Sequence, residues 1–280
     1  MIKVNKLLFG TAGIPISTPD RNTINGIKQV KKLGLGSMEM EFVQNVNVSK
    51  ELAPKVKKTA EENDIVLTSH ASYYINLNSE DKAKVHASMN RLIDSARRTH
   101  ECGGYSTTFH PAFYLGMDAK KVYDSVKERM KQVMKQLDDE SIDIWVRPET
   151  TGKQTAFGDL KELCKLSSEF EKVLPCIDFS HLHARSNGKE NTTEEFRLQF
   201  ELLEKELGKI ALKNMHCHLS GINYGDKGEK NHLPLEESDM NYKDLLKIFK
   251  EFKISGVITC ESPNIEEDAL LLQKTYNKLK

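Results

Sequence analysis

The chain has 280 residues, of which 38% are hydrophobic and 29% are charged. This length and composition allow a large buried core, and they exclude both a disordered chain and a protein embedded in a membrane. Lysine plus arginine and aspartate plus glutamate balance at 41 each, so net charge gives no sign of a polyanionic partner, although bound divalent cations could supply a positive field locally.

Short apolar, β-branched segments alternate along the chain with longer charged segments of helical period. In chain order, the predicted strands are Leu7–Phe9, Ser37–Phe42, Ile65–Ser69, Ser106–His110, Ile142–Pro148, Leu174–Phe179, Met215–Leu219 and Val257–Glu261. The clearest predicted helices are Lys50–Asn63, Asp81–His100, Asp118–Leu137, Asp159–Phe170, Thr193–Leu207, Asn241–Phe252 and Ile265–Leu279. Alternating strands and helices indicate a parallel sheet, and eight strands favour its closure into a barrel. We therefore predict an α/β protein with a single (β/α)8 TIM barrel domain over residues 1–280.

The five cysteines are scattered and include no Cys-x-x-Cys pair. The first residues, Met1–Lys6, lack the apolar stretch of a signal peptide. Both features favour a reducing compartment over one that supports disulfides. We expect a cytoplasmic monomer with no membrane association.

Histidines and carboxylates fall at or just beyond the predicted strand ends. They are His70, His110, His181, His183, His216, His218 and His232, with Glu149, Asp178 and Glu261. In a parallel barrel these ends open onto one face, so residues far apart in sequence converge there. A carboxylate buried directly after an apolar segment is costly unless it is paired, and metal coordination removes that cost. Imidazole and carboxylate ligands suit Zn²⁺, Mn²⁺ or Fe²⁺, and they are too many for one ion, because zinc takes about four. The sequence predicts two or three metals and favours phosphodiester hydrolysis.

Six sequence blocks, in this order, resemble the endonuclease IV family of apurinic/apyrimidinic endonucleases. The blocks are His70–Leu77, Phe109–Pro111, Glu149–Gly152, Cys176–His181, Met215–His218 and Cys260–Pro263. The resemblance spans nearly the whole chain. It implies a (β/α)8 barrel with three zinc ions that cleaves DNA 5′ to abasic sites in base-excision repair.

The resemblance also implies a role for each matching residue. A first zinc would be held by His70, His110 and Glu149. Glu149 would bridge to a second zinc, which Asp178, His216 and Glu261 would complete. A third zinc would be held by His181, His232 and an acidic residue from the loop of His232. Glu149 and Glu261 would be the catalytic residues, with Glu261 orienting the attacking hydroxide, and Tyr73 would lie near the DNA.

The chain departs from the family pattern at three places. The loop of the third zinc usually reads Asp-Arg-His, but here Glu229 stands three residues before His232, and Asp226 is a competing ligand. Residues 41–48 lack the arginine that enters the DNA stack in family members. His218 stands where the family often has asparagine.

Three further residues are candidate substrate contacts. His183 and His218 each lie two residues beyond a proposed ligand, and on a strand that spacing places them on the same face as the ligand. Arg185 follows shortly after and could meet a phosphate. An ordinary polar role is the alternative for all three.

Two other functions remain open. A sugar isomerase or epimerase of the same barrel class would use one or two divalent metals at the strand ends, whereas three favour the nuclease. A nucleic-acid-binding protein that has lost the chemistry would bind damaged DNA without cleaving it.

Overall fold

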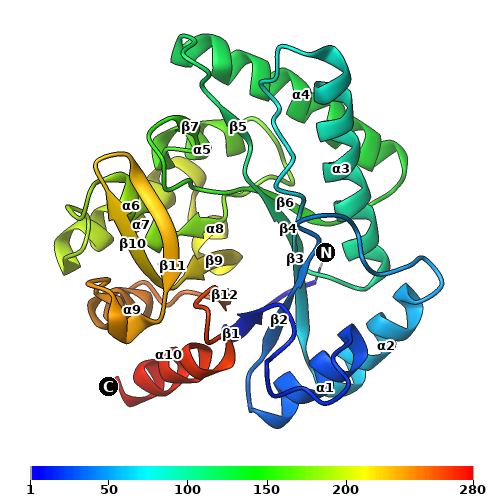
Figure 1. The fold of residues 1–280 in the computed structure, drawn as a ribbon, viewed down its shortest axis with the longest axis vertical. Coiled ribbons are helices and arrows are strands. Elements are labelled where there is room, and N and C mark those ends of the chain that lie inside the picture. The colour runs from blue at the N-terminus through cyan, green and yellow to red at the C-terminus, as the bar shows by residue number, and fades with distance from the viewer. Residues whose placement is uncertain (1, 280) are drawn as a thin grey trace.

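The computed structural model describes residues 2–279, in which eight parallel strands form one sheet that curves into a TIM barrel (Figure 1). The strands are β1 (Leu7–Ala12), β2 (Ser37–Glu41), β3 (Val66–His70), β4 (Ser106–Phe109), β6 (Trp145–Pro148), β8 (Ile177–Asp178), β9 (Met215–Leu219) and β12 (Gly256–Cys260). They lie in the order β6-β4-β3-β2-β1-β12-β9-β8. Parallel bridges from Val146 to Val173 and from Glu149 to Cys176 join the two edges. The predicted (β/α)8 TIM barrel is confirmed, and all eight predicted strands are present.

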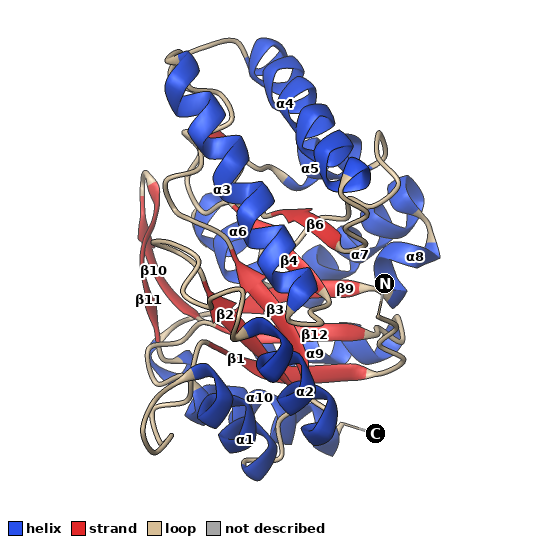
Figure 2. Cartoon of the chain, turned by 90° about the vertical axis from the view of Figure 1, so that its right-hand side faces the viewer, coloured by secondary structure: helices blue, strands red, loops and turns tan. Residues whose placement is uncertain are grey.

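Helices surround the sheet (Figure 2). They are α1 (Thr23–Lys32), α2 (Ala53–Asn63), α3 (Lys82–Glu101), α4 (Ala119–Asp139), α5 (Leu160–Ser167), α6 (Phe179–Arg185), α7 (Thr193–Leu207), α8 (Lys209–Lys213), α9 (Tyr242–Glu251) and α10 (Glu266–Lys278), with a 3-10 turn at Leu235–Glu237. The seven predicted helices are confirmed, with shifted ends. Helices α1, α6 and α8 were not among the predicted helices. Of the described residues, none belongs to a helix with the length and apolar character needed to cross a bilayer.

Helix α6 changes the predicted structure most at the functional end of the barrel. The predicted strand Leu174–Phe179 ends at Asp178, and the chain turns directly into a helix. The Asp178 side chain accepts a hydrogen bond of 2.7 Å from the backbone N–H of His181, which caps the helix N-terminus. A capping aspartate at the end of an apolar segment therefore marks the boundary that periodicity missed.

The interior of the barrel changes character along its axis. At the strand N-terminal end, Tyr105 and Trp145 belong to a small apolar cluster. The buried guanidinium of Arg147 lies over both rings, 5.3 and 5.5 Å from their centroids, and donates to the Pro175 and Asn214 carbonyls. This packing fills the bottom of the barrel, so the remaining polar interior is concentrated toward the mouth.

A two-stranded hairpin extends from the mouth of the barrel. Strands β10 (Gly221–Gly225) and β11 (Gly228–Leu233) pair antiparallel, and Figure 2 shows them at the left of the molecule, where the barrel strands end. A second small pair, β5 (Ala112–Phe113) and β7 (Ala156–Phe157), also lies at the mouth, where Ala112, Phe113 and Ala156 line its cavity. Both pairs belong to βα loops, the part of this fold that builds functional sites.

Candidate metal centre

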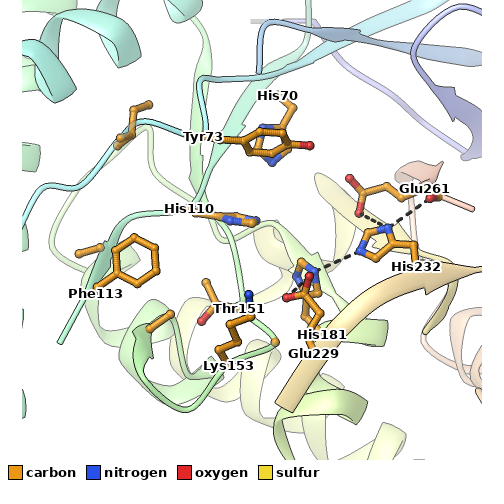
Figure 3. Close-up of a pocket in the computed structure, with 14 residues that line it drawn as sticks. His70, Tyr73, His110, Phe113, Thr151, Lys153, His181, Glu229, His232 and Glu261 are labelled. Atoms are coloured by element: carbon orange, nitrogen blue, oxygen red, sulfur yellow. Dashed lines mark hydrogen bonds and ion pairs between the residues drawn. The ribbon is translucent and has the colours of Figure 1, made fainter. Parts of the chain in front are cut away.

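The mouth of the barrel holds a cavity of about 260 Å³ (Figure 3). Its lining includes His70, Tyr73, His110, Lys153, His181, Glu229, His232 and Glu261. These side chains come from β3, from the segments after β3, β4, β6 and β12, from α6 and from β11. The structure thus brings together residues that are spread over most of the chain, as the predicted strand ends require.

Glu149 is the centre of this arrangement, and its side chain is fully buried. Its carboxylate oxygens lie 3.3 Å from the Nε2 atoms of both His70 and His110. They also lie 3.4 Å from Nδ1 of His181 and 3.3 Å from Nδ1 of His218. Burial by itself would raise the pKa of Glu149, but the surrounding histidines, His218 foremost, hold that pKa well below its usual range. Glu149 therefore carries negative charge inside the protein.

The ligand atoms divide into three groups at the mouth, within each of which they lie no more than 4.8 Å apart. The first group is His70, His110 and Glu149, the second is Glu149, Asp178, His218 and Glu261, and the third is Asp178, His181 and His232. The first group has the predicted membership. Asp178 and Glu149 each belong to two groups, so the three groups are adjacent.

The prediction that His216 belongs to the second group is wrong, because His218 lies there instead. Both residues are on β9 and point into the barrel, but His216 lies one layer deeper. Its Nδ1 contacts the Ser106 hydroxyl at 2.9 Å and its Nε2 contacts a Glu39 carboxylate oxygen at 2.9 Å. Both ring nitrogens are thus already engaged away from the mouth. The prediction that His216 and His218 share one face of the strand was correct, but the choice of His216 as the ligand was not.

The distances within the groups are those of ligands around a cation. A charge-assisted hydrogen bond is about 2.7–2.9 Å long. The contacts between histidine nitrogens and carboxylates within the first two groups all measure 3.3 Å. Tetrahedral zinc with bonds of about 2.0–2.1 Å separates neighbouring ligand atoms by about 3.3 Å. Oδ2 of Asp178 and Oε2 of Glu261 are buried and accept no hydrogen bond from the described residues. The donor set and its spacing therefore fit divalent cations.

Glu229 lies beside the third group, and a β-bulge puts it there. Its carboxylate lies 3.6 Å from Nε2 of His181, which lies 3.4 Å from Nε2 of His232. In an unbroken strand Glu229 and His232 would face opposite sides, because they are three residues apart. The register shifts at this point, with Asn223 opposite Asn231 and Tyr224 opposite Glu229, so Lys230 is the extra residue. The bulge compensates for the additional residue between acid and histidine.

The competing candidate, Asp226, lies in the turn between β10 and β11 and does not line the cavity. Gly152 faces Glu229 from across the site, and a Cβ at that position would lie 2.6 Å from the Glu229 Cβ. A residue without a side chain is therefore needed at Gly152 for Glu229 to reach the third group.

Two of the predicted substrate contacts lie elsewhere. His183 was assigned to a strand, but it lies on helix α6, where a spacing of two residues does not keep side chains on one face. It is fully buried, its Nε2 donates to Asp239 at 3.0 Å, and its ring contacts Tyr224. Arg185 donates to the Lys153 and Ala156 carbonyls and so ties two loop segments together. Neither prediction agrees with these positions.

Tyr73, in contrast, stands at the opening of the cavity. Its side chain is 58% exposed, and its ring centroid lies 5.3 Å from that of His70. The neighbouring Tyr74 is also exposed but does not line the cavity. Tyr73 is therefore placed to contact a molecule that enters the mouth.

Two glutamates on β2, the buried Glu39 and the half-buried Glu41, were not predicted. Glu39 contacts both His216 and His218, and these histidines outweigh the effect of burial and hold its pKa well below the usual range. Burial and the charge of Glu39 raise the pKa of Glu41 to about 8. Ser37-Met38-Glu39-Met40-Glu41 alternates polar and apolar residues, which is typical of a strand that presents one face to a polar site. That alternation was the available signal.

Comparisons with known proteins agree with this geometry. A family model described as xylose isomerase-like TIM barrel matches residues 27–278. An uncharacterized protein of Methanocaldococcus jannaschii is 45% identical over 273 residues, 98% of each chain. A probable endonuclease 4 of Chlorobium phaeobacteroides is 28% identical over 155 residues, 53% of each chain.

Solved structures support the fold. Endonuclease IV from Thermus thermophilus matches with a TM-score of 0.71 and 18% identity, over 95% of this chain and 97% of that one. A D-tagatose 3-epimerase-like protein matches with a TM-score of 0.71 and 15% identity, over 96% of both chains. At these identities the two structures share the barrel with this chain, and the chemistry has to be argued from the site.

Proposed function

The chain belongs to the xylose isomerase-like TIM barrel family, and from that premise we propose that it is a metal-dependent endonuclease that hydrolyses the DNA phosphodiester 5′ to an abasic site. The observation that carries the proposal is the third ligand group, completed by Glu229. A sugar isomerase or epimerase needs only one or two cations, which the first two groups would hold. The sequence similarity to a probable endonuclease 4 supports the same choice.

Three divalent cations, with zinc the first choice and Mn²⁺ or Fe²⁺ as alternatives, would be held by the three groups. The ligands would be His70, His110 and Glu149; Glu149, Asp178, His218 and Glu261; and His181, His232 and Glu229, beside Asp178. When bound, such cations supply Lewis-acid chemistry, which offsets the charge of a phosphodiester and makes water a nucleophile at neutral pH. This set keeps every predicted ligand except His216, which His218 replaces.

The chain's own side chains would position the reactants. Glu261 lies between the second and third groups, with Oε2 at 3.3 Å from Nδ1 of His218 and 4.0 Å from Nδ1 of His232. From there it can accept a hydrogen bond from water and orient it. Lys153 lines the cavity and adds a positive charge near the bound phosphate. Tyr73 offers an exposed ring to an abasic sugar or to a neighbouring base.

A duplex with one tetrahydrofuran abasic analogue tests the proposal directly. We expect the zinc-loaded protein to cut this strand immediately 5′ to the analogue and to leave a 3′-hydroxyl, as resolved on a denaturing gel with size markers. The same duplex without the analogue should stay intact. An uncut lesion strand, with three metals bound per chain, would overturn the proposal.

The second candidate function is a metal-dependent sugar isomerase or epimerase. It is favoured by the second group, which combines two glutamates with Asp178 and His218, and by residues 41–48, which contain no arginine. The number of metal ions bound per chain discriminates between the two functions. Three ions per chain support the nuclease, and one or two together with exchange of a ketose C–H proton in deuterated water support the epimerase.

Matched alanine variants test the assignment of the third group. We expect Glu229→Ala to lose one metal per chain, because it removes the only carboxylate of β11 that reaches His181. Asp226→Ala, which changes a carboxylate in the adjacent turn, should retain all of the metal. Elemental analysis after gel filtration measures both. Loss of metal from Asp226→Ala alone would show that the ligand is Asp226.

A further inference from the structure

Residues 41–48 contain no arginine, but helix α3 places arginines beside this segment. The segment connects β2 to α2, and it lines a groove of about 480 Å³ together with α3 and with Ser72, which follows β3. Arg91, Arg97 and Arg98 of α3 line the same groove. The neighbouring helix therefore supplies positive charge that the segment itself lacks.

The three arginines differ in how far their charge is already neutralised. Carboxylate oxygens lie 2.5 and 2.7 Å from Arg97 and 3.1 Å from Arg98. Arg91 is half-buried, and among residues 2–279 it has neither a hydrogen-bond partner nor a carboxylate within 4.0 Å. Of the arginines in this groove, Arg91 is therefore the one whose charge is available to an anion.

The guanidinium of Arg91 contacts an exposed aromatic ring. Its Cζ lies 5.7 Å from the ring centroid of Tyr74, whose side chain is 65% exposed. A cation–π contact uses none of the five N–H donors of a guanidinium. The ring therefore stabilises the position of the Arg91 side chain and leaves its donors available for hydrogen bonds.

The groove is continuous with the mouth of the barrel. Ser72 lines the groove, and the next residue, Tyr73, lines the cavity of the candidate metal centre. The Tyr73 N–H donates to the Val43 carbonyl at 2.9 Å, which joins the segment after β2 to the segment after β3. A long molecule that lies across Tyr73 can therefore contact the metal centre and Arg91 at the same time.

We propose that Arg91 binds a backbone phosphate of the DNA duplex beside the lesion, while the metal centre holds the phosphate that is cleaved. A guanidinium presents paired donors that match two phosphate oxygens. Gln44 and Asn45 line the same groove, and their exposed amides make no side-chain hydrogen bond in the part of the chain that the structure describes, so they can donate to that phosphate as well. The inference rests on the proposed nuclease function and adds a phosphate site outside the metal centre.

The groove distinguishes DNA from a smaller substrate. An occupant of both sites has to carry two phosphates along one chain, and the sugar or sugar phosphate on which an epimerase acts carries no second phosphate for Arg91. The chain has a formal net charge of zero, so attraction to a polyanion has to come from local groups. Arg91 is such a group, and bound cations at the mouth would be another.

The binding experiment compares wild type, Arg91→Gln and a matched control. The control is Arg129→Gln, because Arg129 is also half-buried and also lacks a hydrogen-bond partner and a carboxylate within 4.0 Å among the described residues, but it lines a separate groove between α3 and α4. Fluorescence anisotropy measures the affinity of each zinc-loaded protein for a labelled undamaged duplex at several salt concentrations. We expect Arg91→Gln to bind about tenfold more weakly. Its slope of log K against log salt concentration should be shallower by about 0.9, the value for one phosphate contact. Arg129→Gln should match wild type.

Single-turnover cleavage of the lesion duplex separates DNA binding from chemistry. Arg91→Gln should need about tenfold more protein to reach half of its maximal rate, and its maximal rate should be unchanged, because Arg91 belongs to none of the three ligand groups. Arg91→Lys keeps the charge without the paired donors. It should therefore recover the salt dependence and only part of the affinity.

Three results would contradict the inference. The first is wild-type affinity and salt dependence in Arg91→Gln. The second is an equal loss in Arg129→Gln, which would indicate a general effect of net charge. The third is a lower maximal rate with unchanged half-saturation, which would indicate damage to the metal centre. A wild type that binds the duplex through Arg91 but leaves the lesion strand uncut would refute the nuclease and support the phosphate site, and a wild type that binds no DNA would refute both.

Discussion

Replacing Glu149 by glutamine is expected to remove the cations of two ligand groups and to lower the rate of abasic-site cleavage by at least about 10³-fold. Glu149 belongs to both the first and the second group, and four histidine nitrogens lie 3.3–3.4 Å from its oxygens. Metal-ion catalysis contributes several kcal/mol to transition-state stabilisation, and each 1.4 kcal/mol is about tenfold in rate. Single-turnover cleavage of the lesion duplex measures the loss, and elemental analysis measures the metals.

Glu266→Gln is the matched control for this variant. It makes the same chemical change at a buried carboxylate that accepts from the Ile16 and Ser17 N–H groups and that belongs to none of the three ligand groups. It should cleave at the wild-type rate. A Glu149→Gln variant that keeps three metals and full cleavage would remove Glu149 from the centre.

Stripping the protein of metal is expected to lower its free energy of unfolding by about 4 kcal/mol or more. A ligand that binds only the folded state at 1,000 times its Kd contributes about 4.1 kcal/mol. Glu149 and Asp178 are fully buried, so removing a cation also leaves their charges uncompensated. For a chain of this size the shift corresponds to a fall in Tm of roughly 8 °C or more.

Thermal unfolding followed by circular dichroism tests this expectation on protein treated with a chelator and then dialysed. Adding back zinc should restore the original Tm. In Glu149→Gln the same treatment should have a smaller effect, because that variant starts with fewer metals. An identical Tm with and without metal in the wild-type protein would show that the three ligand groups do not need cations for the stability of the fold.

The sequence predicted which residues make up the candidate site more completely than it predicted their contacts. Strand-end position identified His70, His110, Glu149, Asp178 and Glu261, because the ends of parallel strands converge whatever the exact shape of the barrel. The two glutamates of β2 were missed, although their alternation with Met38 and Met40 was visible in the sequence. The histidines that Glu39 contacts lie on β9, which is not a neighbour of β2, and sequence patterns carry no information about contacts across the barrel.

The sequence by itself determined the fold class and the set of residues at the mouth, because both depend on local periodicity and on where each strand ends. The tertiary structure decided which of two histidines on one face of β9 reaches the second group, since that depends on how deep the strand sits in the barrel. It also decided that His183 faces away, because Asp178 caps a helix there. A bulge at Lys230 brought Glu229 beside His181. The choice between the histidines depends on contacts between segments far apart in the chain, whereas the helix cap and the bulge are local features that the alternation of polar and apolar residues does not encode.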